Sequence, residues 1–251
     1  MKSFFIPFFT AIRFLTLFPV SWKVEKDGDY FPASLYFFPV VGLMIGAFAF
    51  ILARMVLVIF PVEVAATIVL GFLAFVSGGL HLDGLADSGD GLLSARPRER
   101  ALEIMKDSRT GSMGVVVVVF LLLGKYSALV AMDREQFCMA VFFMPLAGRC
   151  FIIFAMSLQR YARKEGGLGQ LFYSGMSRKA AVPAGSVLVG SLLPMAGPDR
   201  LTAFVLTVFP VFFGFIYLCN KKLGGATGDT LGALCEIVEL MTAVSFVLFL
   251  T

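Results

Sequence analysis

The sequence predicts an all-α, polytopic integral membrane protein: a helical bundle with about seven transmembrane helices, preceded by an interfacial N-terminal helix. Two observations carry this prediction. Of the 251 residues, 59% are hydrophobic and only 15% are charged, whereas soluble domains average about 25% charged residues. The mean hydropathy is +0.89, and the apolar residues fall in runs close to the roughly 20 residues that a helix needs to cross a bilayer. One membrane domain over residues 1–251 is expected.

Polar or glycine-rich turns separate the apolar runs. Residues 1–20 are apolar but are interrupted by Pro7, Arg13 and Pro19. No small-residue cleavage site follows them, so they predict an interfacial helix rather than a cleaved signal. The last run is the least regular, because Glu236 and Glu239 interrupt its first half. The seven predicted spans are residues 33–60, 64–82, 113–132, 137–158, 180–196, 201–219 and 230–250.

The distribution of Lys and Arg predicts an orientation. Of 21 such residues, three fall within predicted spans and two, Arg134 and Arg200, lie in one set of loops. The remaining sixteen lie in the N-terminal segment and in the loops after the second, fourth and sixth spans. Cytoplasmic loops are enriched in Lys and Arg, so the N-terminus and these loops are predicted to be cytoplasmic and the C-terminus outside. The net charge of +4 is too small to indicate nucleic-acid binding.

An acidic motif follows the second predicted span. Asp83, Asp87 and Asp90 stand at positions i, i+4 and i+7, which would place them on one face of a helix. Neighbouring carboxylates repel one another, and a divalent cation would remove this conflict; an oxygen-only ligand set suits Mg²⁺ or Mn²⁺. The alternative is a solvated interfacial turn that merely ends the span. His81, the only histidine, is a candidate member of the same site because it lies two residues before Asp83.

Two further segments on the same predicted side carry candidate anion ligands. Basic side chains next to glycines before a helix form anion sites; otherwise the basic residues would only flank a span. A second glycine-rich turn precedes the last span and ends in a carboxylate. The candidates are Lys106, Asp107, Arg109 and Gly111 in the first segment, and Gly228 and Asp229 in the second.

Several charged residues fall inside predicted spans. A charge within the bilayer costs roughly 2.5–3.5 kcal/mol on insertion scales and therefore usually faces the bundle interior. Arg149 is expected to reach a phosphate, whereas Lys125 is expected to be structural, paired with a carbonyl or an acid. Arg54 is expected to snorkel, and Glu236 is a further candidate for the site. The four cysteines lack a C-x-x-C spacing and are expected to be buried, inert thiols.

Together these motifs resemble those of the cobalamin synthase family, also called adenosylcobinamide-GDP ribazoletransferases. The resemblance covers nearly the whole chain, including Phe14–Pro19 and Phe38–Gly46. Its most specific part is the stretch Gly-Gly-Leu-His-Leu-Asp-Gly-Leu-Ala-Asp-Ser-Gly-Asp-Gly at 78–91. It continues with Met-Lys-Asp-Ser-Arg-Thr-Gly at 105–111, Gly148-Arg149 and Gly-Ala-Thr-Gly-Asp at 225–229.

The resemblance implies a reaction of coenzyme B12 biosynthesis in the inner membrane of a prokaryotic cell. A hydroxyl of α-ribazole, or of its 5′-phosphate, attacks the phosphate of adenosylcobinamide-GDP, and GMP leaves, with Mg²⁺ as cofactor. The substrates and the lipid bilayer are the expected partners; self-association and association with other corrinoid-assembly enzymes are left open. The implied catalytic residues are Asp83, Asp87, Asp90, Asp229 and His81, of which Asp83, Asp87 and Asp90 bind the metal. Phosphate binding falls to Lys106, Asp107, Arg109, Gly111, Arg149 and Gly228.

Two other functions compete with this one. A CDP-alcohol-type lipid phosphotransferase also uses spaced aspartates at a membrane boundary. Here, however, Asp83-Gly-Leu-Ala-Asp87 with a third Asp at position 90 departs from the Asp-x-x-Asp-Gly run of those enzymes. A membrane transporter would place its polar groups near the bilayer midplane and often shows an inverted repeat. Neither feature is visible in this sequence.

Overall fold

The prediction of an all-α protein is confirmed. The computed structural model describes residues 2–20, 27–163, 166, 168–173 and 175–248, and within these ranges it contains helices and no strand beyond one bridge between Tyr161 and Ala226. The α-helices are α1 (Lys2–Leu15), α2 (Phe31–Ser34), α3 (Phe38–Ile59), α4 (Val62–Val76), α5 (Leu80–Leu92), α6 (Arg98–Ile104), α7 (Ser112–Val130), α8 (Arg134–Leu158), α9 (Gly175–Leu223) and α10 (Gly228–Val247). Three 3-10 turns are η1 (Asp27–Tyr30), η2 (Leu35–Phe37) and η3 (Leu168–Phe172).

Helix α9 consists of two spans that run in opposite directions. Its 49 residues contain a non-helical backbone at Gly197, with φ +85° and ψ 172°. Before this point the chain runs antiparallel to α8, since Cys150 Sγ lies 3.5 Å from the oxygen of Ala184 and Ser177 bonds to Met156. Beyond it, Arg200 donates to the carbonyl of Phe246 at the end of α10. The predicted fifth and sixth spans, joined at 197–200, correspond to these two halves.

The number of spans agrees with the sequence. Within the described residues, five helices are long and apolar enough to cross a membrane, and the bent pair α4–α5 makes up to six. The reversal at Gly197 adds one more. The last predicted span, 230–250, corresponds to α10, although residues 249 and 250 lie outside the described residues.

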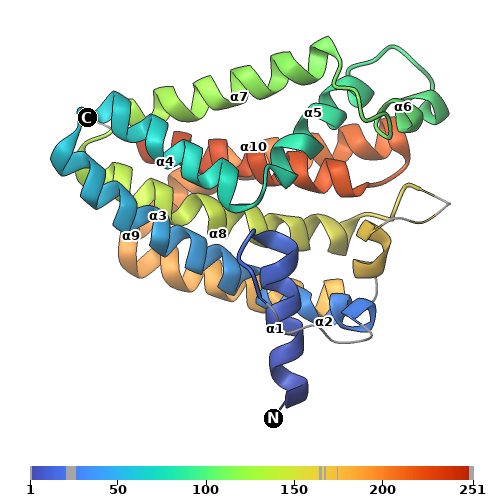
Figure 1. The fold of residues 1–251 in the computed structure, drawn as a ribbon, viewed down its shortest axis with the longest axis horizontal. Coiled ribbons are helices and arrows are strands. Elements are labelled where there is room, and N and C mark those ends of the chain that lie inside the picture. The colour runs from blue at the N-terminus through green and yellow to red at the C-terminus, as the bar shows by residue number, and fades with distance from the viewer. Residues whose placement is uncertain (1, 21–26, 164–165, 167, 174, 249–251) are drawn as a thin grey trace.

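The long helices lie side by side, with α8 among α3, α9 and α10, and α7 along another side of the bundle (Figure 1). Close contact depends on small residues, as is usual between membrane helices. A Cβ atom on Gly46 of α3 would lie 2.1 Å from the backbone oxygen of Phe142 on α8. Helix α1 crosses the direction of the long helices (Figure 1), in agreement with the predicted interfacial helix. All four cysteines are buried and free, as expected.

The predicted end of the second span at Leu82 is wrong. Helix α4 ends at Val76, and the chain turns through Gly78 (φ +62°) and Gly79 (φ +72°), a backbone conformation that favours glycine. Helix α5 then starts at an angle of 87° to α4. The segment from Asp83, which was predicted to follow the span, is helical up to Leu92, in keeping with the helical spacing of its three aspartates. The apolar run continues through Leu80 and Leu82, and hydropathy alone gives no sign of the bend.

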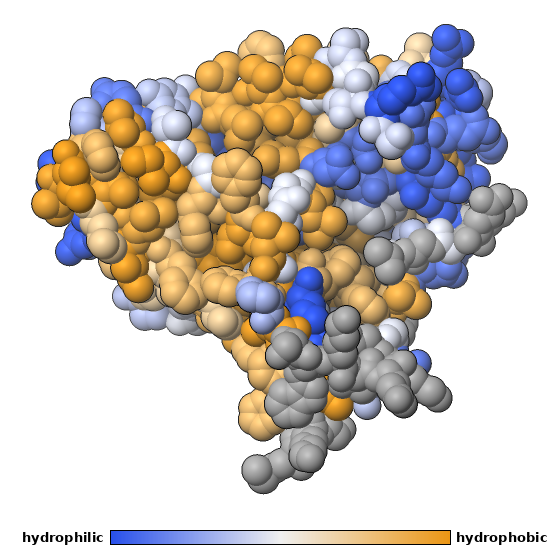
Figure 2. All heavy atoms as spheres, viewed as in Figure 1, coloured by the Kyte–Doolittle hydropathy of each residue, from blue (hydrophilic) through white to orange (hydrophobic). Residues whose placement is uncertain are grey.

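The polar motifs gather at one end of the bundle. Figure 2 shows hydrophilic side chains over the end that carries α5 and α6, and a broad hydrophobic surface over the middle of the molecule. Helix α10 starts at this polar end beside Asp229, and its other end lies near Arg200. The acidic and glycine-rich segments therefore share one side, as the sequence predicts.

Candidate active site

The three aspartates of the acidic motif lie on α5, whose helical backbone places them on one face. Asp83 is exposed, and Asp87 and Asp90 are half-buried. Helix α10 crosses α5 very closely at Gly84, because a Cβ atom there would lie 2.7 Å from the backbone oxygen of Asp229. The glycine therefore brings the acidic motif against the first turn of α10, and the sequence-predicted Asp83 and Asp229 meet.

Asp229 is held by groups from two directions. The first turn of α10 closes with a capping box in which Thr227 and Thr230 exchange hydrogen bonds, so the backbone at Asp229 is fixed. Arg163 donates to Asp229 Oδ2 from 2.5 Å, and the Thr227 hydroxyl donates to the same oxygen from 3.2 Å. The Nε of Arg163 is enclosed and unpaired within the described residues. The Arg163 side chain also lines the smaller cavity of the site.

Negative charge dominates the acidic face. Asp87 is partly desolvated and is repelled, in decreasing order, by Asp83, Asp229 and Asp90, and is attracted by Arg163. In the described part of the chain, neither Asp83 nor Asp87 makes a hydrogen bond or ion pair. Carboxylate oxygens are among the ligands that Mg²⁺ takes. Among the described residues, no group of three His, Cys, Asp or Glu side chains lies close enough together to hold a metal ion.

Asp90 has a structural partner. Its two carboxylate oxygens accept hydrogen bonds from the backbone N–H groups of Gly111, at 2.6 Å, and Gly114, at 2.8 Å. These groups open α7, and the free N–H groups of a helix N-terminus favour a carboxylate. A Cβ atom on either glycine would lie within 2.6 Å of the carboxylate. Asp90 thus joins α5 to α7, and the Gly111 N–H expected to bind phosphate binds this side chain.

The basic segment after α6 lies at the same polar end but mostly on the outside. Arg109 pairs with Asp107 at 2.7 Å and is 86% exposed. Hydrogen bonds from the Arg109 side chain and backbone lower the pKa of Asp107 to about 2. Lys106 lines a surface depression together with Arg98 and Arg163. Of this segment, Thr110 rather than Arg109 reaches the cavity beside Asp83.

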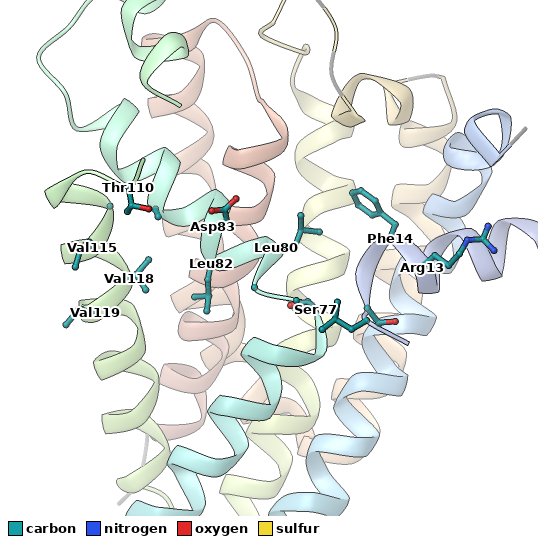
Figure 3. Close-up of a pocket in the computed structure, with 16 residues that line it drawn as sticks. Arg13, Phe14, Ser77, Leu80, Leu82, Asp83, Thr110, Val115, Val118 and Val119 are labelled. Carbon is teal, nitrogen blue, oxygen red and sulfur yellow. The ribbon is translucent and has the colours of Figure 1, made fainter. Parts of the chain in front are cut away.

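Two cavities meet at Asp83. The larger, of about 750 Å³, lies between α7 and the end of α1 (Figure 3). Figure 3 shows Val115, Val118 and Val119 on one side of it and Phe14 on the other. The smaller cavity, of about 230 Å³, lies towards α8 and α10 and is lined by His81, Arg163, Gly228 and Asp229. Asp83, Phe14 and Leu80 line both cavities, so the exposed carboxylate lies between them.

An aromatic cluster closes the smaller cavity. The ring of Phe172 lies 4.8 Å from that of Phe14, 5.0 Å from that of Phe31 and 5.6 Å from that of Phe38, measured between centroids. Phe172, Phe14 and Phe38 line the cavity. Segments distant in sequence, from α1 to η3, thus meet at one wall. The apolar start of the chain therefore contributes to the site, which the sequence did not indicate.

The charges within the spans form one buried network. Lys125 donates to Glu236 at 2.6 Å and to Glu239 at 2.7 Å, and Arg149 donates to Glu239. None of the four side chains is more than 7% exposed. The expectation that Lys125 pairs with an acid is confirmed. The terminal nitrogens of Arg149 face Glu239 and His81, so Arg149 lies behind the site and does not line either cavity at Asp83.

Comparison with known proteins decides the family. The family model described as cobalamin-5-phosphate synthase matches residues 7–247. The chain belongs to the cobalamin-5-phosphate synthase family. Relatives named adenosylcobinamide-GDP ribazoletransferase support this membership and confirm the resemblance found in the sequence. No solved structure matches the chain.

The similarity to family members extends from end to end. The relative from Clostridium acetobutylicum is 34% identical over 98% of this chain and 99% of its own length. The relative from Pseudomonas fluorescens is 37% identical over 97% of this chain and 100% of its own length. A third, from Alkaliphilus metalliredigens, is 37% identical over 92% of this chain and 91% of its own length.

In this family member, Gly84→Ala is expected to lower activity strongly. The new methyl group would meet the backbone oxygen of Asp229 at 2.7 Å, and backbone atoms cannot move aside without separating α5 from α10. Overpacking of this kind costs about 1–3 kcal/mol. The matched control is Gly71→Ala on α4, where a Cβ atom meets nothing within 4 Å. Equal thermal stability and product formation in both variants would contradict the close crossing.

Proposed function

We propose that this chain is an adenosylcobinamide-GDP ribazoletransferase of coenzyme B12 biosynthesis. It would join the cobinamide phosphate to a hydroxyl of α-ribazole, or of its 5′-phosphate, and release GMP. The observation that carries the proposal is the placement of Asp83 where two cavities meet, in a chain whose end-to-end relatives bear this name. A transferase with two substrates needs adjoining binding spaces and a charged group at their junction.

The chemistry is a displacement at phosphorus. The hydroxyl oxygen of the acceptor forms a bond to the phosphorus that carries cobinamide, the bond from this phosphorus to the GMP oxygen breaks, and the hydroxyl proton passes to a base. Such transfers depend on positioning and charge neutralisation more than on covalent chemistry. Asp83, Asp87 and Asp229 are the candidate bases, since they are the carboxylates gathered at the α5–α10 crossing. Arg163, which lines the smaller cavity and binds Asp229, is the candidate phosphate ligand beside them.

Mg²⁺ is part of the proposal. Asp83 and Asp87 would hold it. Each carboxylate oxygen of Asp90 already accepts one backbone hydrogen bond, so Asp90 would bind the ion only through its remaining lone pairs. When bound, the ion would neutralise the charge of the diphosphate. The support is the set of ligand atoms, which are carboxylate oxygens that repel one another at Asp87. Within the described residues, Asp83 makes no ion pair with a basic side chain.

We also propose that the site faces the cytoplasm from a prokaryotic inner membrane. The polar end of the bundle carries α6 and the segments with most of the Lys and Arg residues (Figure 2). The C-terminal end of α10 would then lie outside. An inside-facing site would have direct access to water-soluble nucleotide substrates.

The test uses purified protein in nanodiscs. Adenosylcobinamide-GDP, α-ribazole 5′-phosphate and Mg²⁺ are supplied, and GMP release is followed with and without EDTA. The expected result is release that requires both substrates and is lost on chelation. The control is Glu63→Gln, which replaces an exposed residue in the first turn of α4 and should retain activity. Absence of release from protein with intact helical structure would contradict the proposal and favour a CDP-alcohol-type lipid phosphotransferase, which a separate assay would detect as CMP release from a CDP-alcohol donor and a lipid alcohol.

A further inference from the structure

His81 stands between the buried network and the smaller cavity. The imidazole is 3% exposed and lines that cavity together with Asp83 and Asp229. On its other side, His81 Nδ1 lies 3.4 Å from Nη2 of Arg149. Arg149 in turn is held by Glu239, which also binds Lys125. A continuous chain of contacts thus runs from the middle of the bundle to the edge of the site.

The contact with Arg149 determines where the histidine carries its proton. A guanidinium has donors and no acceptor, so His81 Nδ1 must accept and cannot itself be protonated. In the neutral ring, the proton therefore lies on Nε2.

The Nε2 atom has no hydrogen-bond partner within the described residues. Four side-chain polar atoms there are both enclosed and unpaired, namely Ser88 Oγ, Arg149 Nε, Arg163 Nε and Tyr173 OH. His81 Nε2 is not among them, although only Nδ1 of this ring has a partner. Since His81 lines the smaller cavity, Nε2 is the ring atom that faces free space.

We propose that the network of Lys125, Glu236, Glu239 and Arg149 fixes His81 as the neutral Nε2–H tautomer, which donates one hydrogen bond to a phosphate oxygen of the substrate bound in the smaller cavity. Arg149 and Glu239 are positioning residues in this arrangement, and His81 touches the substrate. The identity of the phosphate rests on the proposed function. The tautomer does not, because it follows from protein contacts alone.

The tautomer is measured directly by ¹⁵N NMR. His81 is the only histidine, so protein labelled with ¹⁵N-histidine and purified without a histidine tag gives one pair of ring signals. The expected spectrum has a protonated Nε2 and an unprotonated Nδ1. A ring protonated at both nitrogens, or at Nδ1 alone, would overturn the proposal whether or not the protein releases GMP.

A charge-balanced variant tests the role of the network. In Arg149→Met/Glu239→Gln one cation and one anion are removed together, and the Lys125–Glu236 pair at 2.6 Å remains. The two ring signals are expected to move towards each other as the tautomers interconvert. Unchanged signals in folded protein would show that Arg149 does not set the tautomer.

Two substitutions of the histidine test the donor. The side-chain amide of Gln extends to the region of Nε2, whereas that of Asn extends only to the region of Nδ1. His81→Asn is therefore expected to lower kcat by about 10²-fold, and His81→Gln by about tenfold or less, because loss of a preorganised donor acts on the transition state. Equal activity of His81→Asn and native protein would overturn the role of the donor. The tautomer is tested separately, by the ¹⁵N spectrum of the native protein.

Discussion

Asp83→Asn is expected to reduce GMP release by at least about 10³-fold, the upper range for loss of one preorganised charge-stabilising group. Asp83 is the exposed member of the acidic face and lines both cavities. Asparagine keeps the shape of the side chain but removes the charge that a cation or a transferred proton requires. The assay is GMP release at saturating substrates and Mg²⁺, together with the yield of membrane-inserted protein.

The yield separates loss of chemistry from loss of folding. Asp83 has no hydrogen-bond partner in the described part of the chain. The variant is therefore expected to insert into the membrane with the same yield as the native protein and to have the same stability to unfolding. Asp90→Asn gives a useful contrast, because Asp90 joins α5 to the start of α7 through two backbone hydrogen bonds. It is expected to lower both stability and activity. Normal turnover by Asp83→Asn would remove this carboxylate from the mechanism.

Glu239→Leu is expected to destabilise the bundle by about 3–5 kcal/mol, the usual result of removing one partner from a buried ion pair. Glu239 is 3% exposed and binds both Lys125 and Arg149. Glu236 still neutralises Lys125 in the variant, but Arg149 keeps no acid within the network. The measurement is the midpoint of unfolding in detergent, followed by intrinsic fluorescence or circular dichroism.

The control is an ion pair of similar length at the surface. Arg54 and Glu135 are 2.8 Å apart, with side chains 56% and 69% exposed. Glu135→Gln is expected to cost no more than about 1 kcal/mol, because water and salt screen exposed pairs. If both variants shifted the midpoint equally, burial would not be the cause of the stability of the network.

Local patterns in the sequence predicted much of this structure. Hydropathy located the spans, and the i, i+4, i+7 spacing of Asp83, Asp87 and Asp90 predicted the helical face that α5 displays. The glycine-rich turn before Asp229 correctly predicted the start of α10. Each of these features depends on residues within about two helical turns of one another. The choice of metal and the role of each aspartate remain predictions.

Other features depend on contacts between distant residues. Arg163 and Asp229 are 66 positions apart, and Arg149 and Glu239 are 90 apart. Arg163 was counted only as one of many loop charges, and Glu239 only as an interruption of a span. Nothing in the neighbourhood of either residue indicates its partner. The 87° bend between α4 and α5 also escaped prediction, since Leu80 and Leu82 continue the apolar run beyond the two glycines that turn the chain.

The buried charge network has a consequence for how the protein is made. Lys125 on α7 and Arg149 on α8 are synthesised long before Glu236 and Glu239 on α10. Until α10 arrives, two helices in the membrane each carry a cation without its acid, at a cost of roughly 2.5–3.5 kcal/mol for each charge. Helix α10 carries two carboxylates, so its insertion into lipid without these cations would also cost free energy. We therefore expect the bundle to close in a joint step, in which the two carboxylates of α10 and the two cations of α7 and α8 neutralise one another.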